Sequence, residues 1–295
     1  MELRTNGEKI FAVFNYIFMT IIAFITLYPM WHILMASFSD PTEVLLHTGA
    51  YFWIRGTPQI RGYILVFQNP SITSGYLNTL IYVGIGTALS MFATILGAYV
   101  LSRKGLYWNK IVMKMIVFTM YFQGGLMPFY MQVRNFGMLD TRWAIILPTM
   151  VVTMNLIILR TAFASAPDSL IESAKLDGCS DWKIVWSIVL PISKAAVAVI
   201  VLFYAVANWN AWFNASIFLT DRTLWPIQLV LREILIQGDT TAMADIGAVG
   251  QAGVERYRML VRYTTIIVAT VPILLVYPFI QKYFVSGVMI GSLKE

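Results

Sequence analysis

The side chains that most often make or break bonds are few in this sequence and lie far apart. Cys179 is the one cysteine, and His32 and His47 are the two histidines. A metal site, or a nucleophile with its base, needs several such groups at suitable spacing, and this sequence offers no such set. His32 follows Pro29 within an apolar run, so we predict a hydrogen-bonded core or interface histidine and not a ligand. The sequence therefore predicts no catalytic residue and no metal centre.

Charged pairing between one protein and another is a second kind of chemistry, and it is indicated between positions 167 and 191. Pro167 suits the first turn of a helix, and Gly178 can end that helix in the left-handed conformation. A second helix follows Ser180, a good N-cap residue, and runs to Pro191. Apolar residues recur at helical spacing in both segments, so we expect a compact helix pair with one apolar and one charged side.

Two of the carboxylates on this predicted helix pair are singled out. Glu172 can form a charge-assisted pair with a basic residue of a partner protein, and the alternative is a solvated helix charge. Asp177 is expected to accept backbone N–H groups at the turn, while Gly178 supplies the backbone geometry. Cys179, beside them, is expected to be an inert small residue.

The elements that must position these residues belong in lipid. Hydrophobic residues make up 58% of the 295 positions and charged residues 12%, against about 25% charged residues in an ordinary soluble domain. The net charge of +6 is spread between apolar blocks, so nucleic-acid binding is not predicted. The sequence has no G-x-x-x-x-G-K-[ST] phosphate loop, so the chain is not predicted to be an ATPase itself.

Uncharged stretches long enough to cross a bilayer as helices recur along the chain. They are apolar on every face, so the predicted fold class is all-α, a polytopic membrane protein with six transmembrane helices. The short basic loop with Arg103, Lys104 and Lys110 should be cytoplasmic under the positive-inside rule, and an even number of spans then places both termini there. The predicted spans lie at about residues 11–38, 76–101, 111–133, 143–161, 193–220 and 260–283.

Neutral polar and aromatic residues within the spans are candidates for a translocation path. A group in the fifth span combines amides with aromatic faces, as sugar recognition does, and the alternative is anchoring at the membrane interface. In the third span, Tyr121 and Gln123 precede two glycines, a run that could form a gate or a kink, and we favour the kink. Asn78 could hydrogen bond across helices or touch cargo. The candidates are Asn78, Tyr121, Gln123, Asn208, Trp209, Asn210 and Trp212.

The segment at residues 224–237 is predicted to be an amphipathic helix at the outer surface, with Arg232 on its polar side. Together with Arg256 and Arg258 it makes the outer mouth basic. These arginines could pair with lipid phosphates and nearby acidic residues. Alternatively, they could dock an acidic binding protein or guide an anionic oligosaccharide, such as one that contains uronic acids.

Several motifs together resemble the membrane permeases of ABC importers. The run from Glu172 to Gly178, followed by Trp182 and Leu190-Pro191, resembles the EAA loop of that family, with Ser173 where alanine is usual. Asn78-Thr79, Asn208-Trp209-Asn210 and the tail at residues 287–294 resemble the carbohydrate-uptake, maltose and oligosaccharide branch, in particular the smaller of its two permease subunits. The tail departs from that pattern at Glu295, where a glycine is usual.

The resemblance implies a function and a set of partners. It implies one transmembrane domain over residues 1–295 of a binding-protein-dependent oligosaccharide importer in the bacterial inner membrane, with a cytoplasmic coupling loop at residues 164–191. The implied partners are a second homologous permease, two ATPase subunits, an extracytoplasmic sugar-binding protein, the oligosaccharide and membrane lipid. This chain would bind no cofactor, because ATP and Mg would reside on the partner ATPase. The implied ATPase-coupling residues are Glu172, Ser173, Ala174, Leu176, Asp177 and Gly178.

Other functional classes were weighed against this interpretation. An intramembrane enzyme would need a catalytic constellation, and a proton-coupled carrier would need a carboxylate within a span, which the sequence does not offer. A structural assembly protein would not need so specific a loop. Cargo remains open among acidic oligosaccharides, neutral oligosaccharides and other solutes.

Overall fold

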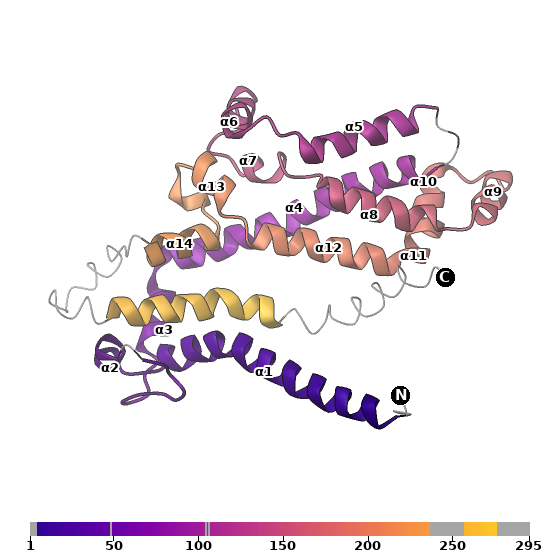
Figure 1. Ribbon diagram of the computed structural model, residues 1–295. Coiled ribbons are helices and arrows are strands. Elements are labelled where there is room, and N and C mark those ends of the chain that lie inside the picture. The colour runs from indigo at the N-terminus through magenta and orange to yellow at the C-terminus, as the bar shows by residue number, and fades with distance from the viewer. Residues whose placement is uncertain (1–4, 48, 104, 106, 237–256, 276–295) are drawn as a thin grey trace. The chain divides into compact units, whose positions relative to one another are not determined.

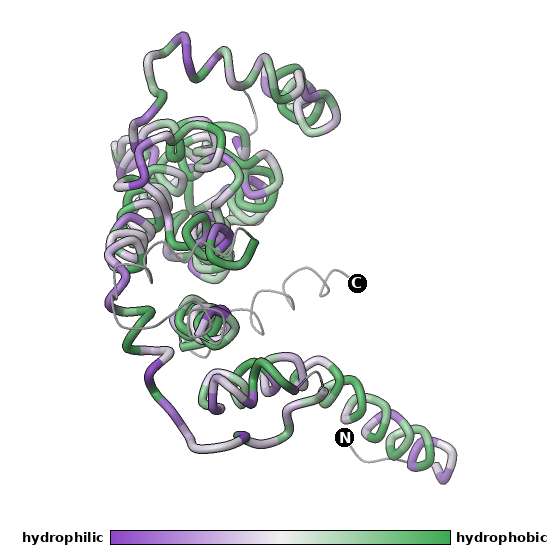
Figure 2. The backbone as a smooth tube through the Cα atoms, turned by 90° about the vertical axis from the view of Figure 1, so that its left-hand side faces the viewer, coloured by the Kyte–Doolittle hydropathy of each residue, from purple (hydrophilic) through white to green (hydrophobic). Residues whose placement is uncertain are grey.

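A computed structural model describes residues 5–47, 49–103, 105, 107–236 and 257–275. Their regular structure is helical throughout, with no strand in these ranges, which confirms the all-α prediction. Hydrophobic residues, drawn in green in Figure 2, recur along the helices. The chain forms two compact units, one of residues 1–70 with 231–271 and the other of residues 71–230 with 272–295.

The first unit is built on α1, which spans Asn6–Ser37 (Figure 1). Thr5 and Glu8 begin the helix with a capping box, in which each side chain binds the other residue's backbone N–H. The most apolar window of α1 buries none of its residues inside the protein, as expected for a lipid-facing helix. The unit also contains α2 (Pro41–Leu46), α3 (Arg61–Gln68) and a helix at Tyr257–Leu275.

His32 is a half-buried, hydrogen-bonded residue of this first unit, which agrees with the prediction of a core or interface histidine. Its Nδ1 atom accepts a hydrogen bond from the Tyr51 backbone N–H at 3.2 Å. The ring also packs edge-on against Tyr51 and Tyr263. No group of three or more His, Cys, Asp or Glu residues is placed to hold a metal ion anywhere in the described ranges.

The second unit is organised around the long helix α4, Pro70–Ser102. Its main hydrophobic core includes Ile95, Leu159, Ile184 and Ile200, which are at most 5% exposed. The remaining helices are α5 (Asn109–Tyr121), α6 (Leu126–Asn135), α7 (Trp143–Ile146), α8 (Thr153–Ala164), α9 (Asp168–Leu176), α10 (Asp181–Ile184), a π-helix (Val185–Val189), α11 (Leu190–Ile192), α12 (Lys194–Trp209), α13 (Phe213–Phe218), a 3₁₀ turn (Arg222–Leu224) and α14 (Ile227–Ile236).

The predicted number of six straight spans is not reproduced in the described residues. Three helices are long and apolar enough to cross a membrane, namely α1, α4 and Tyr257–Leu275, and the number rises to five if each of two bent helix pairs is one span. The predicted spans at 11–38 and 76–101 coincide with α1 and α4. The last predicted span, at 260–283, begins in the third helix, and its end lies outside the described residues.

The other three predicted spans are interrupted. The span at 111–133 divides into α5 and α6, which meet at 116° around Gly125, whose φ is +86°. The preference for a kink over a gate is consistent with this geometry, because glycine adopts positive φ without a steric penalty. The span at 143–161 stops at Ile146, just before Pro148, and the span at 193–220 stops at Trp209 before α13 begins. Counting apolar residues did not detect these breaks.

One break shows how a non-helical backbone is accommodated in this unit. Residues 147–152 are not helical, and the Val152 N–H donates to the Tyr204 hydroxyl at 3.1 Å. Tyr204 is 2% exposed and also hydrogen bonds Thr94 of α4 at 2.7 Å. The tyrosine thereby satisfies a backbone donor that would otherwise be costly to leave unpaired in lipid.

The predicted amphipathic helix at 224–237 is present but differs in position and burial. It begins at Ile227, and the sequence places it at the surface, whereas Ile227, Leu229, Val230 and Leu231 are at most 6% exposed. The Ile227 backbone N–H donates to Thr79 Oγ1 of α4 at 2.8 Å. The apolar side of α14 is therefore packed inside the protein while Arg232 is exposed, so the predicted amphipathic character is confirmed, and the helix begins three residues later than predicted.

Candidate functional site

Helix α9 projects a polar surface from a small apolar base. Ile171 and Ala174 are 5% and 7% exposed and join the main core of the second unit. Glu172 and Ser173 are exposed on the other side, and Leu176 is 90% exposed. A leucine this exposed next to a carboxylate makes a surface suited to a protein partner.

The C-terminus of α9 has the geometry predicted from Gly178. This glycine has a φ of +77°, the left-handed conformation. Its N–H donates to Lys175 O at 3.0 Å, and the N–H of Cys179 donates to Ala174 O at 2.9 Å. These two bonds form a Schellman motif, and Cys179 packs against the same core as Ala174. The expected role of Cys179 as a small packing residue therefore agrees with its position.

The expected role of Asp177 is wrong in one respect. Its backbone N–H donates to Ser173 O at 3.0 Å, but its carboxylate accepts no backbone hydrogen bond within the described chain. The Schellman bonds satisfy the last helix carbonyls at this turn without the side chain of Asp177. Asp177 is exposed, so its charge is available to a partner.

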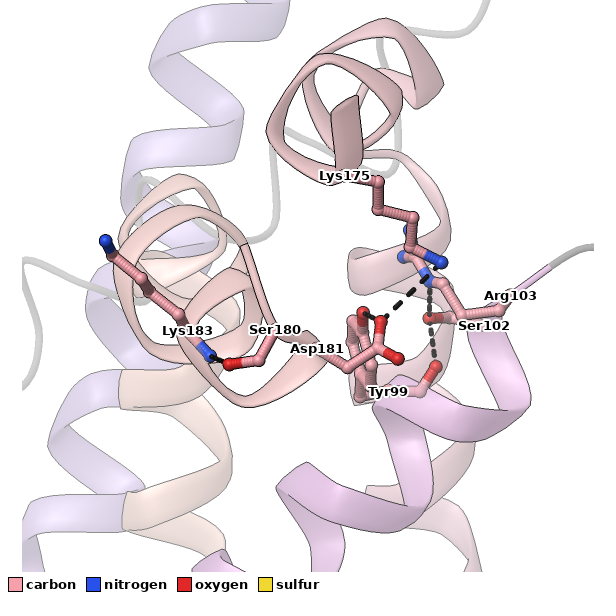
Figure 3. Close-up of polar contacts among 7 residues, drawn as sticks. All are labelled: Tyr99, Ser102, Arg103, Lys175, Ser180, Asp181 and Lys183. Atoms are coloured by element: carbon pink, nitrogen blue, oxygen red, sulfur yellow. Dashed lines mark hydrogen bonds and ion pairs between the residues drawn. The ribbon is translucent and has the colours of Figure 1, made fainter. Parts of the chain in front are cut away.

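The residue that holds this region together is Asp181, which the sequence did not single out. Tyr99 at the end of α4 donates its hydroxyl to Asp181 Oδ1 at 2.7 Å, and Lys175 Nζ lies 3.6 Å from the same oxygen. Figure 3 shows Asp181 between these two side chains. The Tyr99 hydrogen bond, assisted by the positive charge of Lys175, lowers the pKa of Asp181 from its ordinary value.

Arg103 extends this cluster toward α8. Its guanidinium lies 5.1 Å from the centre of the Tyr99 ring, and its Nη2 donates to Phe163 O at 2.8 Å. Arg160 of α8 donates from Nε to Leu101 O at 3.1 Å. The ends of α4 and α8 are thus joined by arginine-to-carbonyl bonds, and α9 begins directly beyond them. No sequence motif marks these contacts, because Tyr99 reaches Asp181 and Arg103 reaches Phe163 across 82 and 60 residues of sequence.

The second helix of the predicted pair is not a single α-helix. Its middle, Val185–Val189, is a π-helix in which the Leu190 N–H donates to Val185 O, five residues back. Pro191 lacks an N–H and its ring would crowd the carbonyl four residues earlier, so a wider turn relieves the clash. Beyond Ser193 the chain bends by 91° into α12. The α9 surface is therefore linked to α12 through an irregular joint.

The polar group predicted in the fifth span lies at the break between α12 and α13. Asn208 donates to Thr87 of α4 at 3.3 Å, and Asn210 accepts from Gln228 at 3.5 Å. Trp209 is 9% exposed, and its buried Nε1 has no hydrogen-bond partner in the part of the chain described. Trp212 is half-buried and packs edge-on against Phe213. The structure thus brings Asn208 and Trp209 against α4.

Two candidates in the third span are placed differently. Tyr121 is 85% exposed at the end of α5, and Gln123 is exposed in the break that follows. Neither makes a side-chain hydrogen bond to the described chain. The structure does not gather them with the residues of α12.

Asn78 is a structural contact and not an open polar group. It is 3% exposed, and its amide nitrogen donates to Thr223 O at 2.6 Å and Trp225 O at 3.2 Å. Its amide oxygen accepts from Arg142 Nη2 at 3.1 Å. Tyr82, one turn along α4, donates to Leu224 O at 2.7 Å. The geometry favours the interhelical alternative for Asn78, because both ends of its amide have protein partners.

Asp140 completes the polar contacts of this segment and was also missed. It is a non-glycine residue with a positive φ of 54°, and its carboxylate accepts the backbone N–H groups of Thr220 and Asp221. These two hydrogen bonds, that from Asp221 being the stronger influence, lower the pKa of Asp140 from its ordinary value. We call Asn78, Thr79, Tyr82, Asp140 and Arg142, which hold residues 220–227, the loop clasp.

Two of the three predicted outer arginines lie in the described residues. Arg232 is exposed on α14 and Arg258 is partly exposed on the helix Tyr257–Leu275. Arg256 lies outside the described residues. The tail at residues 287–294, on which part of the family resemblance rests, also lies outside them.

The chain matches known proteins over nearly its whole length. Residues 6–290 match the family described as binding-protein-dependent transport system inner membrane component. The polygalacturonan/rhamnogalacturonan transport system permease protein YtcP of Bacillus subtilis is 42% identical over 292 residues, which cover 97% of this chain and 99% of that protein. Protein LplC of the same organism is 37% identical over 291 residues, covering 99% of this chain and 97% of that protein.

A solved structure is also similar. It is the crystal structure of a bacterial ABC transporter involved in the import of the acidic polysaccharide alginate, and one of its chains superposes with a TM-score of 0.86. The two sequences are 28% identical, and the match covers 96% of this chain and 100% of the other.

Proposed function

The chain belongs to the family of binding-protein-dependent transport system inner membrane components, and from this premise we propose that it forms half of the translocation pore of an ATP-driven oligosaccharide importer. Relatives at 42% and 22% identity are named as permease proteins of transport systems, so the chain is the non-catalytic membrane component. Its partners in this proposal are a second homologous permease, two ATPase subunits that bind ATP and Mg, and an extracytoplasmic sugar-binding protein.

The surface of α9 is the observation that carries the coupling mechanism. Glu172, Ser173 and Leu176 are exposed side by side along one short helix, while Ile171 and Ala174 anchor it in the core. In the proposal this surface docks on the ATPase, with Glu172 paired to a basic residue and Leu176 buried in the contact. The Asp181 cluster then ties movement of α9 to α4, and the π-helix ties it to α12.

The proposed topology follows from this docking. The loop at residues 164–191 and both termini face the cytoplasm, in agreement with the basic residues Arg103, Lys104 and Lys110 near the end of α4. Six crossings are proposed, with the broken segments α5 to α6, α7 to α8 and α12 to α13 each contributing one. Broken helices are tolerated at membrane depth where their backbone groups find partners in the protein, as the Val152 N–H does with the Tyr204 hydroxyl.

Acidic oligosaccharides are the proposed cargo. The protein YtcP is named for polygalacturonan and rhamnogalacturonan, and the similar crystal structure is described as importing acidic alginate. The chain itself has a formal net charge of +6, and Arg232 is an exposed positive residue of α14. Asn208 and Trp209 are proposed to lie along the path, where an amide and an indole N–H can bind sugar hydroxyls.

The test is reconstitution of the complete complex. The detergent-solubilised complex is purified through this chain, and ATP hydrolysis is measured with a binding protein loaded with either a neutral or a uronic-acid oligosaccharide. Recovery of a second permease and an ATPase, with hydrolysis stimulated by the acidic sugar, is the expected result. Stimulation by the neutral sugar alone would overturn the cargo, and recovery of the chain without an ATPase would overturn the coupling role of α9.

A further inference from the structure

A cavity of about 750 Å³ opens between the end of α4, the start of α5 and the end of α8. It lies entirely within the second unit and is separate from the exposed surface of α9. Nothing in the coupling mechanism uses it. Its polar lining consists of Ser102, Arg103, Asn109, Lys110, Lys114 and Arg160.

The charge of this cavity is uniformly positive. Arg103, Lys110, Lys114 and Arg160 line it, and none of its described lining residues is acidic. Helix α5 also begins here without a side-chain N-cap, so the N–H groups of its first turn add partial positive charge. The cavity is therefore suited to an anion.

The two arginines are held in place by hydrogen bonds that use only part of each guanidinium. Arg160 uses Nε for Leu101 O, while Arg103 uses Nη2 for Phe163 O and Nε for Ser102 Oγ. Asn109 fixes the start of α5 by donating to the carbonyl oxygens of Leu101 and Arg103 at 3.0 Å each. The remaining guanidinium N–H groups can bind phosphate oxygens in the fork geometry that arginine favours.

The apolar wall of the cavity decides which anion fits. Met113, Val117 and Phe118 of α5 continue the lining beyond Lys110 and Lys114. No residue of α5 is buried in the protein, and Phe118 is 60% exposed. Positive charge followed along one helix by exposed apolar side chains matches a molecule with an anionic head and hydrocarbon chains. A free phosphate or an acidic protein segment would use the cations and leave the apolar strip uncovered.

We propose that this cavity is a binding site for an anionic phospholipid of the adjacent leaflet, which is the cytoplasmic leaflet in the proposed topology. The phosphate lies among Arg103, Lys110, Lys114 and Arg160, and the acyl chains lie along α5 from Met113 to Phe118. Basic pockets between transmembrane helices bind lipid headgroups by this chemistry. The bound lipid would steady the junction of α4 and α8 that supports α9.

The experiment compares lipid binding to the intact purified complex carrying either of two matched double substitutions. Lys110→Gln with Lys114→Gln removes two cavity charges, and neither side chain makes a described hydrogen bond or ion pair, so the fold is preserved. Lys9→Gln with Lys183→Gln removes two exposed charges elsewhere. Phosphatidylglycerol and phosphatidylcholine are titrated separately, and the bound lipid is counted by native mass spectrometry.

The cavity variant is expected to bind phosphatidylglycerol about thirtyfold more weakly, because each basic residue contributes about fivefold to binding an anionic lipid. Its phosphatidylcholine binding should be unchanged, and the control variant should match the wild type. Equal loss in both variants would overturn the site, since charge alone would explain it. Displacement of the lipid by millimolar glycerol 3-phosphate would assign the cavity to soluble phosphates instead. The readout does not depend on transport, so it stands apart from the test of the importer.

Discussion

The α9 surface and the loop clasp both contain polar residues, but these residues face outward on α9 and inward in the loop clasp. On α9 the buried residues are small and apolar, and Glu172, Ser173 and Asp177 face outward. In the loop clasp, Asn78 and Thr79 are at most 3% exposed and bind backbone groups of the chain itself. Polar residues on α9 are therefore exposed and proposed to contact a partner protein, whereas those of the loop clasp bind the protein's own backbone.

This difference explains why a polar residue in an apolar segment is a poor guide to a cargo site. A buried amide without partners is costly in lipid, and Asn78 avoids that cost by binding two carbonyls and an arginine. Asn208 makes one long hydrogen bond to Thr87, and Trp209 has a buried N–H without a described partner. Trp209 and Asn208 are accordingly better path candidates than Asn78.

The largest expected effect comes from a substitution on the outward-facing α9 surface. Glu172→Lys should reduce sugar uptake by about tenfold or more, because it replaces the attraction of a charged pair with repulsion at a protein interface. Uptake of labelled oligosaccharide into cells or proteoliposomes is the measurement. Glu43→Lys, the same charge change on an exposed position of α2, is the control. Unchanged uptake in Glu172→Lys would remove α9 from the coupling mechanism.

A substitution in the inward-facing loop clasp is expected to reduce the stability of the protein. Asn78→Leu should destabilise the second unit by about 2 kcal/mol, because it removes three part-buried hydrogen bonds, to the Thr223 and Trp225 carbonyl groups and from Arg142. Thermal unfolding of the purified complex, followed by fluorescence, measures the loss. Asn208→Leu, which removes a single 3.3 Å hydrogen bond, should cost less. If Asn78→Leu impairs uptake while the unfolding temperature stays constant, Asn78 is a path residue after all.

The turn that ends α9 gives a smaller effect. Gly178→Ala should destabilise the helix end by about 1 kcal/mol, since alanine is strained at a φ of +77°. Gly84→Ala in α4 is the matched control, because an added methyl group there meets nothing within 4 Å and the backbone is helical. The two unfolding temperatures should shift in opposite directions, and a fall of the same size in both would contradict the argument from φ.

The smallest effect concerns pH. The pKa of Asp140 is lowered in the folded protein, so its carboxylate contributes stability above its unfolded pKa of about 3.9. That contribution is lost as the pH falls through the lower folded pKa. Asp140→Asn should therefore be less stable than the wild type at pH 7, and the difference should shrink as the pH falls below the unfolded pKa. Unfolding temperatures of the two proteins across this range test the sign, and a gap that widens in acid would refute it.

Much of the α9 region was predictable because its signals are local. Pro167, Ser180 and Gly178 act on the backbone within a few residues of their own positions, and the predicted helix pair and left-handed turn are present. The resemblance to permeases is confirmed by the family match over residues 6–290. Asp181 was not predicted as an anchor, because its partner Tyr99 lies 82 positions earlier in the chain.

The amino-acid sequence by itself determined that this protein lies in lipid, that it is helical and to which family it belongs. The high content of apolar residues places most of the chain in lipid. Helices suit lipid because their backbone N–H and C=O groups are hydrogen bonded within the helix. The tertiary structure alone decided where those helices break and which polar residues hold the broken segments in place by hydrogen bonds. Val152, Asn78 and Asp140 show why, since each has its partner more than 50 residues away. Hydrophobicity is summed along the chain, whereas these hydrogen bonds exist only after distant segments have packed.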